Sequence, residues 1–176
     1  AKQGCKRIIM GLGGSATNDG GCGAAAACGV KFFDEQGHSF VPVGETLSNI
    51  AKVDITNLVE ELRDMPVVTM CDISNPLCGP LGAATVFGPQ KGATPEQVVM
   101  LDDGLRHLAE LVEKELGKNI LELPGSGAAG GMGGGMVAFF GSRLQLGIET
   151  VLDTVGFDEL IKDADVIFTG EGCFDG

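Results

Sequence analysis

The sequence predicts an α/β fold, in which buried strands lead through glycine-rich loops into helices that cover a sheet. Three segments support this prediction. An apolar run at residues 7–10 is typical of a buried strand, and the alanine-rich residues 22–28 that follow a glycine-rich loop are typical of a buried helix. The β-branched run at residues 66–71 is typical of a central strand. Residues 94–116 carry apolar side chains at the spacing of an amphipathic helix.

The length and composition fit one folded unit of this class. The chain has 176 residues, of which 44% are apolar and 20% are charged, and these values exclude a disordered or fibrous protein. We therefore expect residues 1–176 to form a single α/β domain. The first strand begins almost at the start of the chain, and the chain ends shortly after its last predicted strand. We expect from this that the domain is a fragment of a larger protein.

The elements between the first helix and the central strand are predicted to be short. Residues 30–34 alternate as a strand and are followed by a turn, and a break at Pro42 and Gly44 precedes a short helical piece that ends near Ile50. Residues 57–63 can form another short helix. The central strand then places Asp72 at its carboxyl end.

The helix over residues 94–116 has clear signals at both ends. Thr94 is a typical N-cap, Pro95 occupies the first helical position, Gln97 stands at the capping-box position and Gly117 ends the helix. The apolar face that we expect to be buried comprises Val98, Leu101, Leu105, Leu108 and Val112.

Three further elements are predicted after this helix. The glycine-dense residues 124–136 either cradle a ligand or let a helix pack closely against a sheet, and we expect both, with Ser126 exposed. Residues 147–155 are expected to form a helix. Residues 164–169 are expected to form a final strand that brings Glu171 to the carboxyl edge of the sheet, where ligands gather in open α/β folds.

The charge and the cysteines exclude several classes of function. A formal net charge of −12, with only 12 Lys and Arg residues, disfavours nucleic acid or an anionic membrane as a partner. No apolar stretch of membrane-spanning length and no signal peptide are visible, so a cytoplasmic location is expected. The six cysteines lack C-x-x-C spacing, and we expect small buried hydrophobic side chains instead of zinc ligands.

Polar residues at three predicted strand ends indicate phosphate chemistry. If these strands share a sheet, four carboxylates and several amide or hydroxyl groups converge beside the glycine-rich loop. Mg²⁺-dependent phosphoryl transfer needs such carboxylates next to bound phosphate. The alternative is that each aspartate only caps a helix or a turn. The converging residues are Ser15, Asn18 and Asp19, Asp72 and Asn75, and Glu171 and Asp175.

The glycine-rich loop at residues 11–21 does not match the commonest nucleotide-binding fingerprints. It lacks the Lys-Ser/Thr ending of a P-loop, and Ala16 stands where the third glycine of G-x-G-x-x-G belongs. Its Gly-Leu-Gly-Gly-Ser-Ala resembles the Gly-Leu-Gly-Ser-Ser-Ala loop of the galactokinase and homoserine kinase superfamily, whose other motifs are not visible here. A galactokinase-type small-molecule kinase is therefore one alternative.

A second resemblance spans nearly the whole chain. Five ordered blocks resemble the glycerate kinase family, type I. They are Gly-Leu-Gly-Gly-Ser-Ala-Thr-Asn-Asp-Gly-Gly (11–21), Cys-Asp-Ile-Ser-Asn-Pro-Leu-Cys-Gly-Pro (71–80), Val-Phe-Gly-Pro-Gln-Lys-Gly-Ala (86–93), Gly-Ala-Ala-Gly-Gly-Met-Gly (127–133) and Thr-Gly-Glu-Gly-Cys-Phe-Asp-Gly (169–176). The resemblance implies an ATP- and Mg²⁺-dependent kinase that converts D-glycerate into 2-phosphoglycerate or 3-phosphoglycerate. It also implies two α/β domains around a cleft, of which this chain covers mainly the inserted second domain.

The resemblance also implies which residues line that cleft. It places Gly13, Gly14, Ser15 and Lys91 in the cleft, where we expect Ser15 and the two glycine amides to position phosphate or the substrate carboxylate. Lys91 either neutralises the charge of the transferred phosphate or is a solvated loop lysine. Asp19 and Asp72 are the candidates for catalytic base and for Mg²⁺ ligand. The further binding residues that it implies are Asn18, Asn75, Glu171 and Asp175.

The last motif block departs from the family pattern at one position, and the chain alone allows an alternative function. Position 173 is often basic in the last block of the family, whereas this chain has Cys173. The chain alone could also act as a non-catalytic module that binds a small anion or a nucleotide, and a homo-oligomer is possible.

Overall fold

The computed structural model describes residues 1–170, which fold into strands, α-helices and two 3₁₀ helices, η1 and η2. In chain order the elements are β1 (Ile8–Gly11), α1 (Cys22–Ala27), β2 (Lys31–Phe33), β3 (Ser39–Phe40), η1 (Gly44–Asn49), β4 (Lys52–Asp54), α2 (Glu60–Arg63), β5 (Val67–Met70), α3 (Ala83–Phe87), η2 (Pro89–Lys91), α4 (Pro95–Leu116), α5 (Ala128–Phe140), β6 (Arg143–Gln145), α6 (Gly147–Val155) and α7 (Phe157–Leu160).

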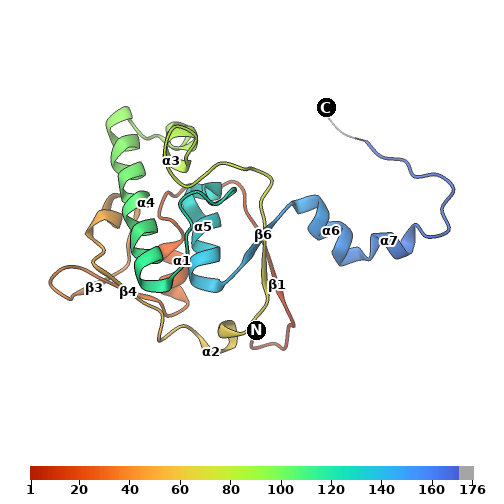
Figure 1. Cartoon of the computed structure of the whole chain (residues 1–176), viewed down its shortest axis with the longest axis horizontal. Helices are drawn as coiled ribbons and strands as arrows, with labels where there is room; N and C mark the ends of the chain where they lie inside the picture. Colours follow the sequence, from red (N-terminus) through yellow and green to blue (C-terminus); the bar gives the residue numbers. More distant parts are fainter. Residues whose placement is uncertain (171–176) are drawn as a thin grey trace.

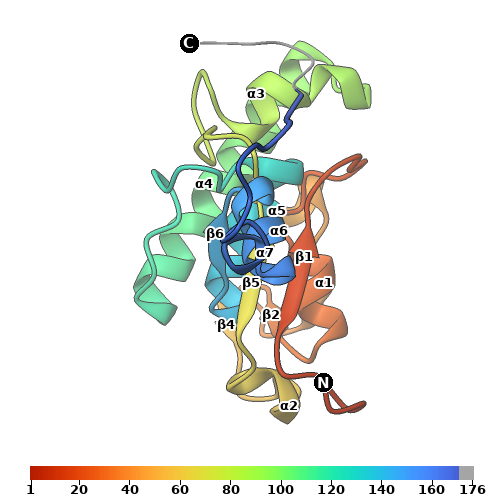
Figure 2. The ribbon, with the colours of Figure 1, turned by 90° about the vertical axis from the view of Figure 1, so that its right-hand side faces the viewer.

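A three-stranded parallel sheet in the order β1-β5-β6 carries the loops of the candidate site. Ile8 pairs with Val67 and Val68 pairs with Arg143. Figure 1 shows α1 and α5 on one side of this sheet and α6 and α7 on the other. The segments that follow β1 and β5 both leave the sheet toward α3 (Figure 2). The predicted α/β class and the pairing of these two strand ends are thus confirmed.

A second, antiparallel sheet in the order β3-β2-β4 closes the far side of the core. Its central Phe32 is fully buried and meets Phe139 of α5 edge to face, with ring centroids 5.7 Å apart. The sequence pattern predicted β2 but neither β3 nor β4. With two residues β3 is too short to show an alternation, whereas residues 51–56 around β4 do alternate between apolar and polar side chains. Among residues 1–170, no helix is long and apolar enough to cross a membrane.

Helix α4 forms as predicted, with both of its caps. The Thr94 hydroxyl accepts a hydrogen bond from the Gln97 amide at 3.3 Å, and Gln97 Oε1 accepts one from the Thr94 amide at 2.9 Å. Gly117 ends the helix in the left-handed conformation. Leu105, Leu108 and Val112 are fully buried in the core, so α4 is held by its apolar face as well as by its ends.

Thr94→Ala is expected to lower the free energy of unfolding by about 1 kcal/mol, because an N-cap hydroxyl that satisfies a helix amide contributes about that much. Thermal denaturation of the variant checks this. Thr56→Ala, at an exposed turn hydroxyl that bonds Asp54 at 2.6 Å, is a control for loss of a hydroxyl outside a helix cap. An unchanged melting temperature for the Thr94 variant would show that the capping box adds nothing to stability.

Helix α5 contains the glycine-dense segment and packs against neighbouring backbone. A Cβ at Gly133 or Gly135 would overlap the carbonyl oxygen of Gly125 or Gly20, respectively. Three successive residues, starting at Ala129 (φ 53°), adopt left-handed angles and kink the first turn. The glycines therefore allow close packing, as predicted, but the closest contacts are with loop backbone and not with the predicted sheet. Ser126 was predicted to be exposed, but it is fully buried because α5 folds back over it.

The predicted strand at residues 164–169 is wrong. These residues form no strand, and Phe168 is 95% exposed. Two small helices, α6 and α7, carry the chain away from the sheet before this segment, as Figure 1 shows. Residues 166–168, which are apolar and have high β-propensity, therefore have no described strand beside them to complete a hydrogen-bonded ladder, and β-propensity without a partner does not make a strand. β6 takes the place beside β5 instead.

Candidate active site

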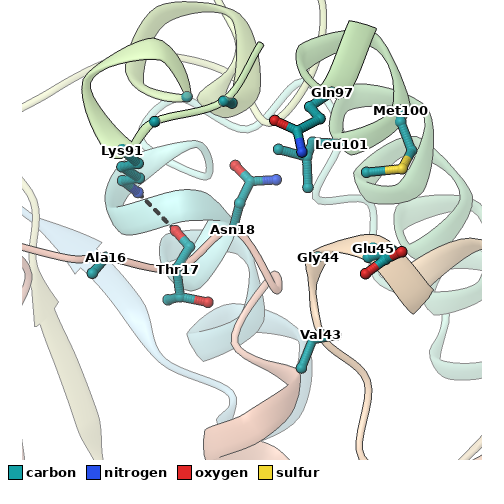
Figure 3. A pocket seen from close by; sticks show the side chains of 13 residues that line it. Ala16, Thr17, Asn18, Val43, Gly44, Glu45, Lys91, Gln97, Met100 and Leu101 are labelled. Atoms are coloured by element: carbon teal, nitrogen blue, oxygen red, sulfur yellow. Dashed lines mark hydrogen bonds between the residues drawn. The ribbon is translucent and has the colours of Figure 1, made fainter.

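Two neighbouring cavities share Lys91 as a common wall. The smaller one, about 240 Å³, lies between the glycine-rich loop, the segment after β5 and the kink of α5. Its polar lining comes from Gly13, Gly14, Ser15, Asp72, Gln90 and Lys91. The larger cavity, about 500 Å³, lies between the same loop, η1 and the start of α4 (Figure 3). The structure thus brings together five of the residues that the sequence placed at the site.

Lys91 holds the glycine-rich loop. Its Nζ donates to Ser15 Oγ at 2.9 Å and to the Thr17 carbonyl at 2.7 Å, and the second of these bonds is drawn in Figure 3. Lys91 is the last residue of η2, and Gly92 follows it in the left-handed conformation that reverses the chain. Partial burial lowers the pKa of Lys91, and the nearby negative charge of Asp19 acts in the opposite direction. The result is a cation placed between the two cavities.

Asp72 follows β5 and faces the smaller cavity. Its Oδ1 accepts a hydrogen bond from the Gly147 amide, the first residue of α6, at 2.7 Å. A Cβ at Gly147 would lie 3.0 Å from Asp72 Oδ2, so the carboxylate packs tightly against the start of α6. The side chain is exposed, and no hydrogen bond to Oδ2 is found within the described residues. One oxygen of Asp72 is therefore anchored and the other faces outward.

Asp19 differs from Asp72 because both of its carboxylate oxygens accept hydrogen bonds. Its two carboxylate oxygens accept hydrogen bonds from the amides of Gly21 and Gly23, at 3.0 and 2.9 Å, and so anchor the first turn of α1. Asp19 is absent from the lining of both cavities. The capping role that the sequence left open thus accounts for the contacts of Asp19, whereas its role as base or Mg²⁺ ligand stays a prediction.

The remaining predicted residues are more scattered. Asn18 lines the larger cavity. Asn75 donates through Nδ2 to the Leu81 carbonyl at 2.9 Å and lines neither cavity. Glu171 and Asp175 lie outside the described residues, and the predicted strand that would have delivered them is absent. The convergence of four carboxylates at one sheet edge is therefore not observed within residues 1–170.

Sequence reasoning missed three parts of the site. The Thr17 carbonyl binds Lys91, Gln90 lines the smaller cavity, and Ala129 brings its strained backbone to the same wall. Gln90 could have been found from its place beside Lys91 in the same sequence block. A carbonyl oxygen and a left-handed alanine carry no sequence signal.

The described side chains fit Mg²⁺ in one arrangement only. No group of three or more His, Cys, Asp or Glu side chains gathers anywhere in residues 1–170, so the protein offers no complete cage there. Mg²⁺ commonly takes one or two protein carboxylates and completes its shell with phosphate oxygens and water. Asp72 suits that arrangement, because its Oδ2 accepts no hydrogen bond from the described residues and the residue lines the cavity that the glycine-rich loop also lines. Both oxygens of Asp19 are occupied by amides.

The fold and the site together define an α/β protein with polar cavities at the strand ends of a parallel sheet. A glycine-rich loop, a lysine and a carboxylate meet at the carboxyl ends of parallel strands, which is where ligands bind in this class. The sequence model of the "Glycerate kinase family" matches residues 1–176, and the chain therefore belongs to the glycerate kinase family.

Relatives and a solved structure agree with this membership. The chain is 46% identical over 173 residues to a glycerate kinase from Halalkalibacterium halodurans and 43% identical over 174 residues to a glycerate 2-kinase from Escherichia coli. These matches cover 98% and 99% of this chain but 46% of each relative. A crystal structure described as glycerate kinase 2 of Salmonella typhimurium LT2 superposes with a TM-score of 0.92 at 45% identity, covering 99% of this chain and 46% of that one. The chain spans about half the length of the curated relatives that it matches.

Proposed function

We propose that these residues are one α/β domain of a longer, two-domain enzyme that transfers the γ-phosphoryl group of ATP to D-glycerate. The observation that carries the proposal is the position of Lys91, which is bonded to the glycine-rich loop and lines the same small cavity as Asp72. Family membership and relatives named glycerate kinase support the substrate and the reaction. One relative is named glycerate 2-kinase, which favours 2-phosphoglycerate as the product.

In the proposed reaction, the loop and the lysine position and neutralise the phosphate. Amides of Gly13 and Gly14 and the hydroxyl of Ser15 donate to phosphate oxygens, and Lys91 compensates the negative charge that the transferred group carries. The glycerate hydroxyl oxygen forms a bond to the γ-phosphorus, the bond from that phosphorus to the β,γ-bridging oxygen breaks, and ADP leaves. The hydroxyl proton passes to a carboxylate. Mg²⁺, when bound, adds positive charge at the phosphates.

Asp72 is the carboxylate that we assign to this chemistry, since it is the acidic side chain that lines the smaller cavity. Two roles use its negative charge, namely acceptor of the hydroxyl proton and ligand of Mg²⁺. Dependence on Mg²⁺ separates them, because a lost ligand raises the Mg²⁺ concentration needed for half-maximal rate. A lost base lowers kcat at saturating Mg²⁺ without that shift.

Phosphorus NMR of the full-length protein with ATP, Mg²⁺ and D-glycerate tests the proposed function. The expected result is one new phosphomonoester resonance, at the position of 2-phosphoglycerate, whose growth matches the loss of ATP. A new resonance at the position of 3-phosphoglycerate would instead show that the other hydroxyl group of glycerate is phosphorylated. ATP consumption that does not depend on D-glycerate would overturn the substrate assignment.

Asp72→Asn is expected to lower kcat by a factor on the order of 10² to 10⁴, the usual contribution of a positioned acid or base. Asn retains an oxygen that can accept from the Gly147 amide, so the fold around α6 is kept while the charge is lost. Steady-state kinetics across Mg²⁺ concentrations is the measurement. Asp153→Asn, on the exposed part of α6, is the matched control and should leave kcat unchanged. Normal turnover by the Asp72 variant would remove this carboxylate from the mechanism.

A further inference from the structure

Asn18 is a buried amide whose polar atoms find no partner within residues 1–170. Its side chain lines the larger cavity, the residue is 8% exposed, and neither Oδ1 nor Nδ2 makes a hydrogen bond to this part of the chain. Figure 3 shows the side chain rising from the loop into the space between Lys91 and Gln97. A buried amide without a partner is costly, because its hydrogen bonds to water are lost and nothing replaces them. Such a group calls for a partner that the described residues do not provide.

The backbone around Asn18 keeps the amide in this position. A Cβ at Gly44 would lie 3.1 Å from the Asn18 carbonyl oxygen, and a Cβ at Gly130 would lie 2.9 Å from the Asn18 Cα. Lys91 holds the preceding Thr17 carbonyl at 2.7 Å. Packing against Gly44 and Gly130 and the hydrogen bond from Lys91 thus fix the backbone of the loop at Asn18. The position of this residue in the cavity wall is fixed with it.

The size of the larger cavity suits a ring-containing ligand. Its volume of about 500 Å³ lies in the range of small-molecule sites, roughly 300 to 1,000 Å³, whereas the smaller cavity at about 240 Å³ lies below it. Val43, Met100 and Leu101 give the larger cavity an apolar side. An apolar wall beside a buried, unpartnered amide can hold a flat heterocycle and, once a neighbouring side chain uncovers the amide, read its polar edge.

The charged side chains of the larger cavity favour one orientation of a charged ligand. Lys91 stands at the wall that it shares with the smaller cavity, and Glu45 stands across the cavity, as Figure 3 shows. A ligand with a negatively charged end therefore points that end toward Lys91 and away from Glu45. The Glu45 carboxylate is able to accept hydrogen bonds from sugar hydroxyls, as acidic residues do at ribose.

We propose that the two cavities form one nucleotide site, in which the larger cavity takes the adenine base and Asn18 reads its edge. The amide offers a donor beside an acceptor, which pairs with the amino group and ring nitrogen of adenine. Lys91 then meets the phosphates where they cross into the smaller cavity. Each Asn18 amide atom exposes less than 1 Å², so pairing requires a neighbouring side chain to rotate. This inference rests on the proposed function, because it places the nucleotide of that reaction.

Asn18→Leu in the full-length protein tests the inference, since leucine has nearly the shape of asparagine and lacks its polar atoms. We expect the KM for ATP to rise about 10-fold or more, from the loss of a paired base contact, and the KM for D-glycerate to change less than twofold. We also expect the melting temperature without nucleotide to rise, because the unpartnered amide is gone. Asn49→Leu, at an exposed position outside both cavities, should change neither constant.

Binding of free adenosine, followed by saturation-transfer NMR, gives a readout that does not depend on turnover. The unsubstituted protein is expected to bind adenosine in preference to guanosine, and Asn18→Leu is expected to lose that preference. Asn18→Ala, which removes the amide without adding bulk, must show the same loss and serves if the leucine variant fails to fold.

The outcomes separate the inference from the function on which it rests. Unchanged ATP kinetics and unchanged adenosine binding in both variants, with normal glycerate phosphorylation, would overturn the inference and leave the proposed function standing. Adenosine binding that depends on Asn18, in a protein that does not phosphorylate glycerate, would support the nucleotide site and overturn the proposed function.

Discussion

Lys91→Met is expected to lower kcat for phosphoryl transfer by a factor on the order of 10² to 10³, the usual effect of removing a preorganised charge from a developing anion. The ammonium group lines both cavities and is bonded to Ser15 Oγ and to the Thr17 carbonyl. Methionine keeps the length of the side chain but supplies no charge and no donor. Steady-state kinetics of the full-length protein with ATP and D-glycerate measures the loss.

A surface lysine provides the control for this experiment. Lys162 is exposed and pairs with Glu159 at 2.7 Å, so Lys162→Met removes the same charge outside both cavities of the candidate site and should leave kcat unchanged. Lys91→Arg retains the charge with a different geometry and should recover part of the rate. A Lys91→Met enzyme with the normal kcat would contradict the assignment of the phosphate to this part of the fold.

Gly130→Ala is expected to lower the free energy of unfolding by about 2 to 4 kcal/mol. An added Cβ would overlap the Thr17 carbonyl oxygen, and the position has φ 71°, which is unfavourable for alanine. The Gly130 carbonyl also accepts from the Gly20 amide at 3.1 Å, so a shift of the kink would pull on the loop. Chemical denaturation measures the stability, and kcat should fall as well, because the same loop carries Ser15 and Asn18.

Gly141→Ala separates steric overlap from backbone strain. Gly141 ends α5 at φ 62°, and a Cβ there would meet nothing within 4 Å. We expect this variant to lose only about 1 kcal/mol, the cost of a left-handed alanine. Equal losses at the two positions would mean that the contact between α5 and the glycine-rich loop contributes little to stability.

Those parts of the fold that rest on local pattern and capping could be predicted from the sequence. The buried runs gave β1, α1 and β5 within a residue or two, and the Thr94 capping box placed the start of α4 correctly. Strand β6 could not be predicted, because it exists only through pairing with β5, which lies far earlier in the chain. Strand β3 is a two-residue hairpin partner of β2 and is too short to show an alternation. The strand predicted at residues 164–169 does not form, because a segment of high β-propensity needs an adjacent strand with which to pair.

The candidate site was predictable in its residue types more than in its geometry. The loop, Asp72 and Lys91 were identified from their sequence blocks, and the structure places them around one small cavity. The sequence could not distinguish Asp19 from Asp72, because both are aspartates after strands and only the fold shows which carboxylate the amides of α1 occupy. The unpartnered amide of Asn18 is likewise a property of packing.

The most direct measurement of the central claim is a crystal structure of the full-length protein with a non-hydrolysable ATP analogue. The account predicts phosphate oxygens within about 2.7 to 3.2 Å of Lys91 Nζ and of donors in the glycine-rich loop, with Asp72 facing the γ-phosphate. An analogue whose phosphates lie away from this loop, with Lys91 still bonded only to Ser15 and Thr17, would contradict it.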